Sequence, residues 1–391
     1  MKKTLAIIGK GTAGCYAAGF FCKQTDWNVD WYYDNTIPPQ SVGEGSTLTF
    51  PDALYDNIDF LLEDLPLVDG NLKSGILKEG WTDNTYTHGF PPPHYGYHFN
   101  AVKLQNLTVE RLKEKYSNRI RFINQNINVA EVEADYIMDC SGKPVDYGDC
   151  NLLTSIPVNS VYVTQCPWDK AEFDYTLATA RPHGWVFGIP LQNRCSVGYM
   201  YNNTTSTLEQ IKEDAKIIFE QNNLKPSEVT NNFSFKNYYR KNNFIANIAY
   251  NGNNSFFLEP LEATSIDCMQ IIQQLALEVW TNKRTIDSAN IRYIELLKEV
   301  ETVIMMHYYA STVFESPFWT LAKQQGNLVM RESMKDPRFV HLLDVSHDWV
   351  QVGEKFERSS SYPFGTWYIP SFRINLDGLG IYKKLKSLLG V

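Results

Sequence analysis

Residues 4–34 read TLAIIGKGTAGCYAAGFFCKQTDWNVDWYYD. The apolar run 4–8 predicts a short strand, the small residues of 12–22 predict a helix, and 29–33 predicts a second strand. A strand, a helix and a strand in this order form a βαβ unit. We therefore expect an α/β fold that opens with a parallel sheet.

The turn inside this unit, residues 9–14, is GKGTAG and satisfies GxGxxG directly after a strand. Gly9 permits a tight turn, Gly11 lets the backbone approach a pyrophosphate, and Gly14 lets helix and strand pack closely. Asp34 lies 20 residues beyond Gly14, where it would hold a ribose. The alternative is an ordinary glycine-rich loop, but the strand context favours dinucleotide binding. At this point FAD and NAD both remain open. The predicted binding residues are Gly9, Gly11, Thr12, Ala13, Gly14 and Asp34.

Composition restricts the partners. The net charge is −8 without a concentrated basic stripe, which disfavours nucleic acid. No apolar run reaches the roughly 18 residues that span a bilayer, and the stretch 5–8 is too short for a signal-peptide core. Seven cysteines without CxxC spacing favour reduced thiols over a disulfide framework or a metal site. We therefore expect a cytoplasmic protein that engages neither membrane nor nucleic acid and binds no metal.

The order of segments predicts three regions. Residues 1–150 form a cofactor lobe, to whose sheet the strand 134–139 and later segments return. Residues 151–265 form an antiparallel β-sheet lobe over the substrate, since 160–201 alternates and is rich in aromatic residues. Residues 266–391 form a helical C-terminal region, because 266–280 and 291–309 have apolar residues at helical spacing.

Residues 37–46, IPPQSVGEGS, resemble the IP…GVGEA/G-T loop of flavin-dependent halogenases of the tryptophan type. Alone, this stretch would be a glycine-rich turn. The resemblance implies a Rossmann-like fold of the monooxygenase and halogenase type that binds FAD rather than NAD. In that family the loop straps over the flavin and connects it to the halide site, which adds Val42, Gly43 and Glu44 to the cofactor-binding residues.

Residues 72–81, LKSGILKEGW, resemble the FK-x-G-I…W segment that carries the catalytic lysine of this family. Lys73 is therefore the leading catalytic candidate. A lysine in a low-polarity tunnel can hold hypohalous acid as a hydrogen-bond donor or, when deprotonated, as a nucleophile that forms a haloamine. Without the motif, Lys73 would be taken for a solvated surface lysine.

Four further segments resemble the family: YHFNA at 97–101, DCSG at 139–142, YTLATA at 175–180 and SPFW at 316–319. They support the fold more than the chemistry. Asn100 replaces the acid of the family's YHFDA, and His98 is expected to be a core histidine. The WxWxIP signature is present as WVFGIP at 185–190, so that Phe187 replaces one tryptophan. In the family this segment walls off the flavin from the substrate. The predicted barrier residues are Trp185, Phe187, Ile189 and Pro190.

Residues 257–266, FLEPLEATSI, closely resemble the family's FLEPLESTGI. The match implies that Glu262 is the active-site glutamate and acts as a pair with Lys73. The segment begins a helix, so the amides of Thr264 and Ser265 would bind a halide. Ala263 removes a hydroxyl and Ser265 replaces a glycine, and both changes weaken the expected chloride site. The alternative is an N-capped structural helix with a surface glutamate.

The resemblance implies a two-component scheme. A separate flavin reductase supplies FADH2, oxygen forms a flavin hydroperoxide, and halide attacks it to give hypohalous acid, which reaches Lys73 and halogenates an electron-rich phenol or indole. Bromide and iodide are expected, and chloride remains open. The chain is short for a tryptophan halogenase, so tryptophan is not assumed as the substrate, and a homo-oligomer remains open. The alternatives are a flavin-dependent aromatic monooxygenase that hydroxylates, and a non-catalytic flavin-binding protein.

Overall fold

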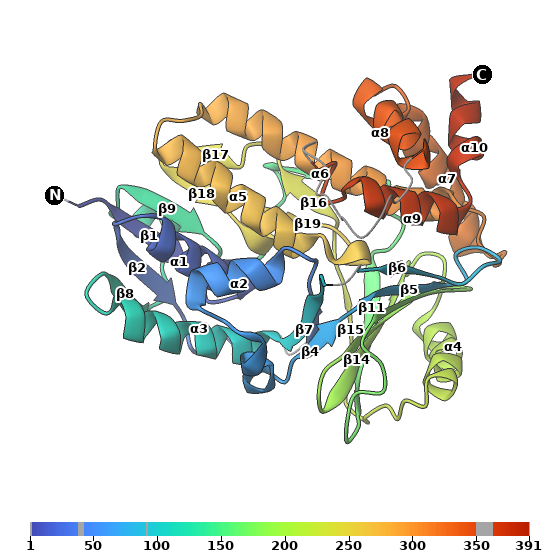
Figure 1. Cartoon of the computed structure of the whole chain (residues 1–391), viewed down its shortest axis with the longest axis horizontal. Helices are drawn as coiled ribbons and strands as arrows, with labels where there is room; N and C mark the ends of the chain where they lie inside the picture. Colours follow the sequence, from blue (N-terminus) through green and yellow to red (C-terminus); the bar gives the residue numbers. More distant parts are fainter. Residues whose placement is uncertain (1, 38–42, 91–92, 349–362, 391) are drawn as a thin grey trace.

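The computed structural model describes residues 2–37, 43–90, 93–348 and 363–390. Within these ranges no helix has the length and apolar character needed to cross a membrane. Figure 1 shows a first lobe that holds the N-terminus and a second lobe beside it, with the C-terminal helices over the second lobe.

The first lobe is built on a six-stranded sheet of order β17-β18-β9-β1-β2-β8. The predicted first strand, β1, lies between β2 and β9 and is parallel to both. The strand expected at 134–139 is β9, and the late strand β18 joins it in parallel. The strands are β1 (Thr4–Ile8), β2 (Asn28–Tyr33), β8 (Ile120–Asn124), β9 (Tyr136–Asp139), β17 (Phe244–Ile245) and β18 (Ile248–Tyr250).

Helices pack around α1, which is rich in small residues and is buried along most of its length. An aromatic cluster at the far end of this lobe includes the stacked rings of Tyr136 and Trp280, whose centroids lie 5.1 Å apart. The neighbours of α1 (Thr12–Gln24) are α2 (Phe50–Ile58), α3 (Ala101–Tyr116) and α5 (Ser265–Trp280).

The second lobe is a seven-stranded sheet of order β15-β11-β14-β13-β12-β5-β6. The antiparallel pairing of β11, β14, β13 and β12 confirms the expected sheet over 160–201. Helix α4 (Leu208–Gln221) covers an apolar face of β11 and β14. The strands are β5 (Gly75–Glu79), β6 (Tyr86–Gly89), β11 (Ser160–Pro167), β12 (Thr176–Arg181), β13 (Gly184–Pro190), β14 (Arg194–Tyr201) and β15 (Thr230–Ser234).

Two three-stranded sheets connect the lobes, with orders β3-β7-β4 and β10-β16-β19. Their strands are β3 (Gly43–Gly45), β4 (Asn71–Lys73), β7 (Gly96–Asn100), β10 (Cys150–Leu152), β16 (Tyr238–Arg240) and β19 (Phe256–Phe257). Short 3-10 helices are η1 (Leu62–Val68), η2 (Val129–Glu131), η3 (Gly252–Asn254), η4 (Leu261–Ala263) and η5 (Ser387–Leu389).

The C-terminal region is helical, as expected. Helix α9 packs against β6, where the Tyr86 hydroxyl donates a 2.9 Å hydrogen bond to the Asn375 Oδ1. The remaining helices are α6 (Ile286–Tyr309), α7 (Pro317–Ser333), α8 (Pro337–Asp348), α9 (Ile369–Leu379) and α10 (Tyr382–Lys386). The expected α/β fold, with an antiparallel lobe and a helical end, is confirmed.

Candidate functional site

The glycine loop is tightly packed at Gly9 and Gly14 and open at Gly11. Gly9 has φ +104°, and a Cβ there would stand 2.3 Å from the Cys140 carbonyl oxygen. A Cβ on Gly14 would stand 2.0 Å from the Gly9 carbonyl oxygen, so helix and loop are in direct contact. A Cβ on Gly11 would meet nothing within 4 Å, and Gly11 is the N-cap of α1 without a side-chain capping bond. The start of α1 is therefore open beside Gly11, as expected for a pyrophosphate site at a helix N-terminus.

The other predicted cofactor residues surround this loop. Thr12, at the start of α1 beside Ala13, donates a 2.9 Å hydrogen bond from its hydroxyl to the Glu44 carboxylate on β3. Burial raises the pKa of Glu44 to about 7, against the opposing effect of that hydrogen bond. Asp34 directly follows β2, and its carboxylate accepts from the amide and hydroxyl of Thr36, which lower its pKa. Val42 lies outside the described residues.

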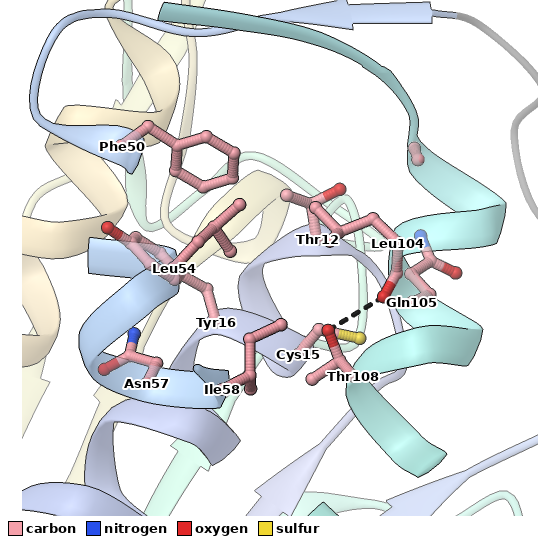
Figure 2. Close-up of a pocket in the computed structure, with 11 residues that line it drawn as sticks. Thr12, Cys15, Tyr16, Phe50, Leu54, Asn57, Ile58, Leu104, Gln105 and Thr108 are labelled. Atoms are coloured by element: carbon pink, nitrogen blue, oxygen red, sulfur yellow. Dashed lines mark hydrogen bonds between the residues drawn. The ribbon is translucent and has the colours of Figure 1, made fainter. Parts of the chain in front are cut away.

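A cavity of about 20 Å³ lies between α1, α2 and α3 (Figure 2). Thr12 and Tyr16 line it from α1, and mostly apolar side chains close it. A volume of this size holds about one water molecule. It is therefore a packing gap beside the loop rather than a nucleotide site.

Lys73 ends β4 and its side chain is fully buried. Its Nζ has no hydrogen-bond partner among the described residues and lies 5.5 Å from the centre of the Phe90 ring. A Cβ on Gly45 would stand 3.5 Å from this Nζ, which places Lys73 against the predicted flavin strap. Burial lowers the pKa of Lys73 to about 7; the charge of Glu262 opposes this shift and that of Lys78 adds to it. The reading as a solvated surface lysine is therefore wrong.

Glu262 is also buried, at the centre of a cluster of basic side chains. Its carboxylate forms an ion pair with Lys78, lies 2.6 Å from the His88 Nδ1, and lies 3.3 Å from the His307 Nε2. Burial alone would raise the pKa of Glu262, but Lys78, then His88 and His307, hold it well below the usual range. The alternative reading as a surface glutamate is therefore wrong.

The charge of Glu262 raises the pKa of Lys73, yet no ion pair joins the two side chains among the described residues. The partner of Glu262 is Lys78, which sequence reasoning missed. The signal was available: β5 alternates, so Lys78 shares its buried face with Ile76. His88 and His307 carried no motif and are brought in by β6 and α6.

Local backbone geometry turns Glu262 into this cluster. Glu262 and Ala263 have φ of 72° and 55°, a left-handed pair at the junction of η4 and α5. Non-glycine residues adopt this conformation only when the surrounding structure holds them in it. From the opposite side of the cluster, the His88 Nε2 lies 3.0 Å from the Ser371 hydroxyl on α9.

The predicted barrier segment is β13. Trp185 is buried, and its indole donates a 3.2 Å hydrogen bond to Glu259, which also accepts from the Tyr308 hydroxyl at 2.8 Å. Phe187 is buried beside it, with ring centres 6.2 Å apart. Ile189 Cγ2 would lie 3.3 Å from a Cβ on Gly43, so β13 meets the strap strand β3 directly, and Pro190 ends β13.

The predicted halide residues stand at the start of α5. Thr264 is the N-cap without a side-chain capping bond, and Ser265 is the first helical residue. Asp267, in the first turn, was not predicted; its carboxylate accepts hydrogen bonds from the hydroxyls of Thr47 at 2.5 Å and Thr49 at 2.6 Å. A carboxylate at this position competes with a bound anion for the positive end of the helix.

A family model described as tryptophan halogenase matches residues 108–362. The tryptophan 7-halogenase RebH of Lentzea aerocolonigenes is 24% identical over 263 residues, which is 59% of this chain and 48% of RebH. The 7-chloro-L-tryptophan 6-halogenase KtzR of Kutzneria sp. (strain 744) is 24% identical over 211 residues, 48% of this chain and 39% of KtzR. The matched stretch thus spans about half or less of the length of these curated relatives.

Solved structures share the fold over almost the whole chain. A tryptophan halogenase from Shewanella frigidimarina has a TM-score of 0.77 at 18% identity, covering 100% of this chain and 93% of that one. BrvH, a flavin-dependent halogenase from Brevundimonas sp. BAL3, has a TM-score of 0.78 at 17% identity, covering 99% and 92%. The family model matches more than half of the sequence. This match and the two structural similarities agree with the geometry of the site. The chain belongs to the tryptophan halogenase family of flavin-dependent enzymes.

Proposed function

We propose that this protein is an FADH2-dependent halogenase that uses oxygen and a halide to halogenate an electron-rich aromatic compound through Lys73. The observation that carries the proposal is the buried Lys73 amine, which lies against Gly45, feels the charge of Glu262 and has no hydrogen-bond partner among the described residues. A buried amine with a pKa near 7 is available as a nucleophile at neutral pH.

The residues of the first lobe fit FAD. The glycine loop, with open space at Gly11, would hold the pyrophosphate, Asp34 the ribose, and Gly43 with Glu44 would cover the ring system. Reduced FAD and oxygen would supply the oxidant that converts halide to hypohalous acid. Supply of FADH2 by a separate flavin reductase is part of the proposal. The protein itself would position Lys73, exclude water with buried side chains and hold Glu262 as a base.

Trp185 and Phe187 would separate flavin from substrate, which supports transfer of hypohalous acid rather than direct oxygen transfer. The substrate is proposed to be a phenol or an indole. The named relatives act on tryptophan or chlorotryptophan, which favours the indole class. All seven cysteines are free and buried, in keeping with a reducing, cytoplasmic location.

Halide preference is proposed to lie with bromide and iodide. Ala263 lacks a hydroxyl, Ser265 adds a side chain where the family has glycine, and Asp267 places a negative charge in the first turn of α5. Each of these three features weakens binding of a small, strongly hydrated anion. Bromide and iodide are also more easily oxidised than chloride.

One experiment tests the proposal. The protein is incubated with FAD, a flavin reductase, and chloride, bromide or iodide in turn, against a panel of phenols and indoles, with products identified by mass spectrometry. Halogenated products dominated by bromide or iodide are expected. Hydroxylated products without dependence on halide would favour the monooxygenase, for which the smaller ring of Phe187 is the supporting observation. Absence of any product would favour a flavin-binding protein.

The Lys73→Ala variant should lose halogenation by at least about 100-fold, because the residue that holds the oxidant is gone. FAD binding, followed by absorbance titration, should remain, because Lys73 is not part of the glycine loop at residues 9–14. Lys335→Ala, at an exposed lysine, is the control and should match the wild type. Halogenation retained in Lys73→Ala would remove Lys73 from the mechanism.

A further inference from the structure

Two lysines and one glutamate lie in the same buried region, but the two lysines differ in their contact with the glutamate. Lys73, Lys78 and Glu262 are all buried, but of the two lysines only Lys78 forms an ion pair with the carboxylate, which His88 and His307 also contact. Lys73 keeps a bare Nζ. Resting on the function proposed above, we propose that Lys78 is the standing counterion of Glu262, and that this pairing leaves Lys73 as the neutral amine that takes up the halogen.

Backbone topology fixes which lysine meets the carboxylate. Lys73 ends β4 in one sheet, and Lys78 lies four residues further along the chain from Ser74, on β5 in another sheet. Between them Gly75, with φ +158°, redirects the chain. Lys78 therefore approaches Glu262 from the large sheet, with its Nζ 5.7 Å from the centre of the Trp81 ring, while Lys73 lies in the β3-β7-β4 sheet.

The lack of a second ion pair then determines the protonation state of Lys73. The Glu262 carboxylate is in direct contact with one ammonium, and a second ammonium in the same apolar region would stand without an ion pair of its own. An uncompensated buried charge costs several kcal/mol in such surroundings, and the group loses its proton instead. Lys73 is the lysine without the partner, so it is the one that becomes neutral.

The other charged and titratable neighbours agree with this assignment. Around Lys73, Asp267 raises its pKa less than burial lowers it, and the buried His98 has a pKa well below the usual range. Around Lys78, burial lowers the pKa while Glu262 and then Glu259 oppose that shift. Burial and then the charge of Lys78 hold the pKa of His307 below its usual value. Lys78, on β5, is the lysine in contact with Glu262.

The chemical step balances with this assignment. The Lys73 nitrogen attacks the halogen of hypohalous acid: the N–halogen bond forms as the O–halogen bond breaks, and the leaving hydroxide takes the amine proton to become water. The arene then attacks the halogen, forming the C–halogen bond as the N–halogen bond returns its electron pair to nitrogen. Glu262, held ionised by Lys78, accepts the ring proton and passes it to that nitrogen, which restores the amine.

Lysine titration in the full chain with bound FAD measures this directly. With ¹³Cε-labelled lysine, the Lys73 resonance is identified by its absence in Lys73→Met. We expect it to titrate near neutral pH in the wild type. In Lys78→Met the unpaired Glu262 would draw a proton onto Lys73, so the midpoint should rise by about one unit or more, a tenfold change or greater. Lys78→Arg keeps the charge and should remain near the wild type.

The double variant Lys78→Met/Glu262→Gln guards against a misfolded single variant. It removes both charges together, so Lys73 should titrate near the wild-type midpoint. A Lys73 resonance that titrates near pH 10 in the wild type, or a midpoint unchanged in Lys78→Met, would overturn the proposal.

Halogenation gives a second readout. In Lys78→Met, kcat should fall about fivefold or more at pH 7 and recover toward the wild type at pH 9, because the neutral fraction of Lys73 falls at pH 7 only. An unchanged or higher kcat at pH 7, despite a raised midpoint, would mean that Lys73 acts as an ammonium and would overturn the proposal. If the titrations behave as expected while the wild type halogenates nothing, the pairing stands and the proposed function fails.

Discussion

At the scale of single residues, different neighbours shift the pKa values of two buried glutamates in opposite directions. Glu262 stays ionised because Lys78 and two histidines surround it. Glu259, three residues away, has neutral donors instead, the indole of Trp185 and the hydroxyl of Tyr308. Burial raises the pKa of Glu259 to about 7, and these hydrogen bonds only partly oppose it. Two glutamates of one short segment are thus prepared for opposite roles.

Glu259 should make stability depend on pH. Because its pKa is raised on folding, the folded state binds the proton more tightly; stability is fully present below the ordinary value of about 4.5 and is lost as pH rises toward 7. Glu259→Gln removes this titration. Between pH 5.5 and 8.0 the wild type should therefore lose about 2 kcal/mol more unfolding free energy than the variant, measured by chemical denaturation.

The matched control is Glu332→Gln, since the Glu332 side chain is 74% exposed. Its pH dependence should follow the wild type. Equal slopes for Glu259→Gln and the wild type would show that Glu259 does not titrate in this range.

At this scale, the sequence identifies a functional residue only where its neighbours along the chain carry the signal. Lys73 and Glu262 were found because their neighbours match family segments, and not because any pattern shows that they are buried. Lys78 and His88 were missed because their meaning depends on Glu262, more than 170 residues away from each. A charged residue on a short strand has no sequence feature that tells a buried ion pair from a solvated surface.

At the scale of elements, β4 and β5 place Lys73 and Lys78 in two different sheets. Ser74 and Gly75 connect a three-stranded sheet to the large sheet. Gly75 has φ +158°, and a Cβ there would stand 2.6 Å from the His88 carbonyl oxygen and 2.9 Å from the Gly89 Cα. Only glycine combines this backbone conformation with so close a neighbour.

Gly75→Ala should therefore destabilise the protein by about 1–3 kcal/mol, because it adds both a steric overlap and a disfavoured φ. Chemical denaturation measures the change. Gly89→Ala, on the paired strand β6, is the control: its Cβ would have no neighbour closer than 3.9 Å, so a change within about 0.5 kcal/mol is expected. Similar losses in both variants would show that the junction at Gly75 is tolerant.

Helices and strands that are determined by the pattern of neighbouring residues were predicted well. The first βαβ unit and the helices at 266–280 and 291–309 appear where periodicity placed them. The parallel pairing of β12 with β5 joins residues about 100 positions apart, with β6 beyond it. Apolar alternation indicates that a strand is half buried, but it does not state the partner strand. The placement of Lys78 in the large sheet therefore could not be derived.

At the scale of the whole molecule, the site is enclosed by segments from both ends of the chain. Ser371 on α9 lies against His88, and the Tyr86 ring fits against Gly378 of the same helix. Figure 1 shows α9 near β6 and well away from α1, α2 and α3 of the first lobe. Closing of the Glu262 cluster and binding of the flavin thus depend on different parts of the structure.

The Gly378→Leu variant tests whether closing of the Glu262 cluster and binding of the flavin depend on different parts of the structure. A Cβ at Gly378 would stand 2.3 Å from the Tyr86 ring, so a larger side chain must push α9 away from β6. Water would then reach the cluster, and the pairing of Glu262 that depends on a dry site would weaken. We expect halogenation to fall about tenfold or more, while the FAD dissociation constant changes less than about twofold, since the glycine loop lies in the other lobe. Hydrogen exchange should speed up in β6 and α9 but not in β1.

Asp377→Ala is the control, because its side chain is 52% exposed and its ion pair with Arg373 lies at the surface. It should retain wild-type activity and exchange. If Gly378→Leu lowered FAD affinity as strongly as activity, the two lobes would act as one cooperative unit. If it left both unchanged, the contact between α9 and β6 would not be what keeps the site closed. The exclusion of water would then have to come from α6, which carries His307 against Glu262 and Tyr308 against Glu259.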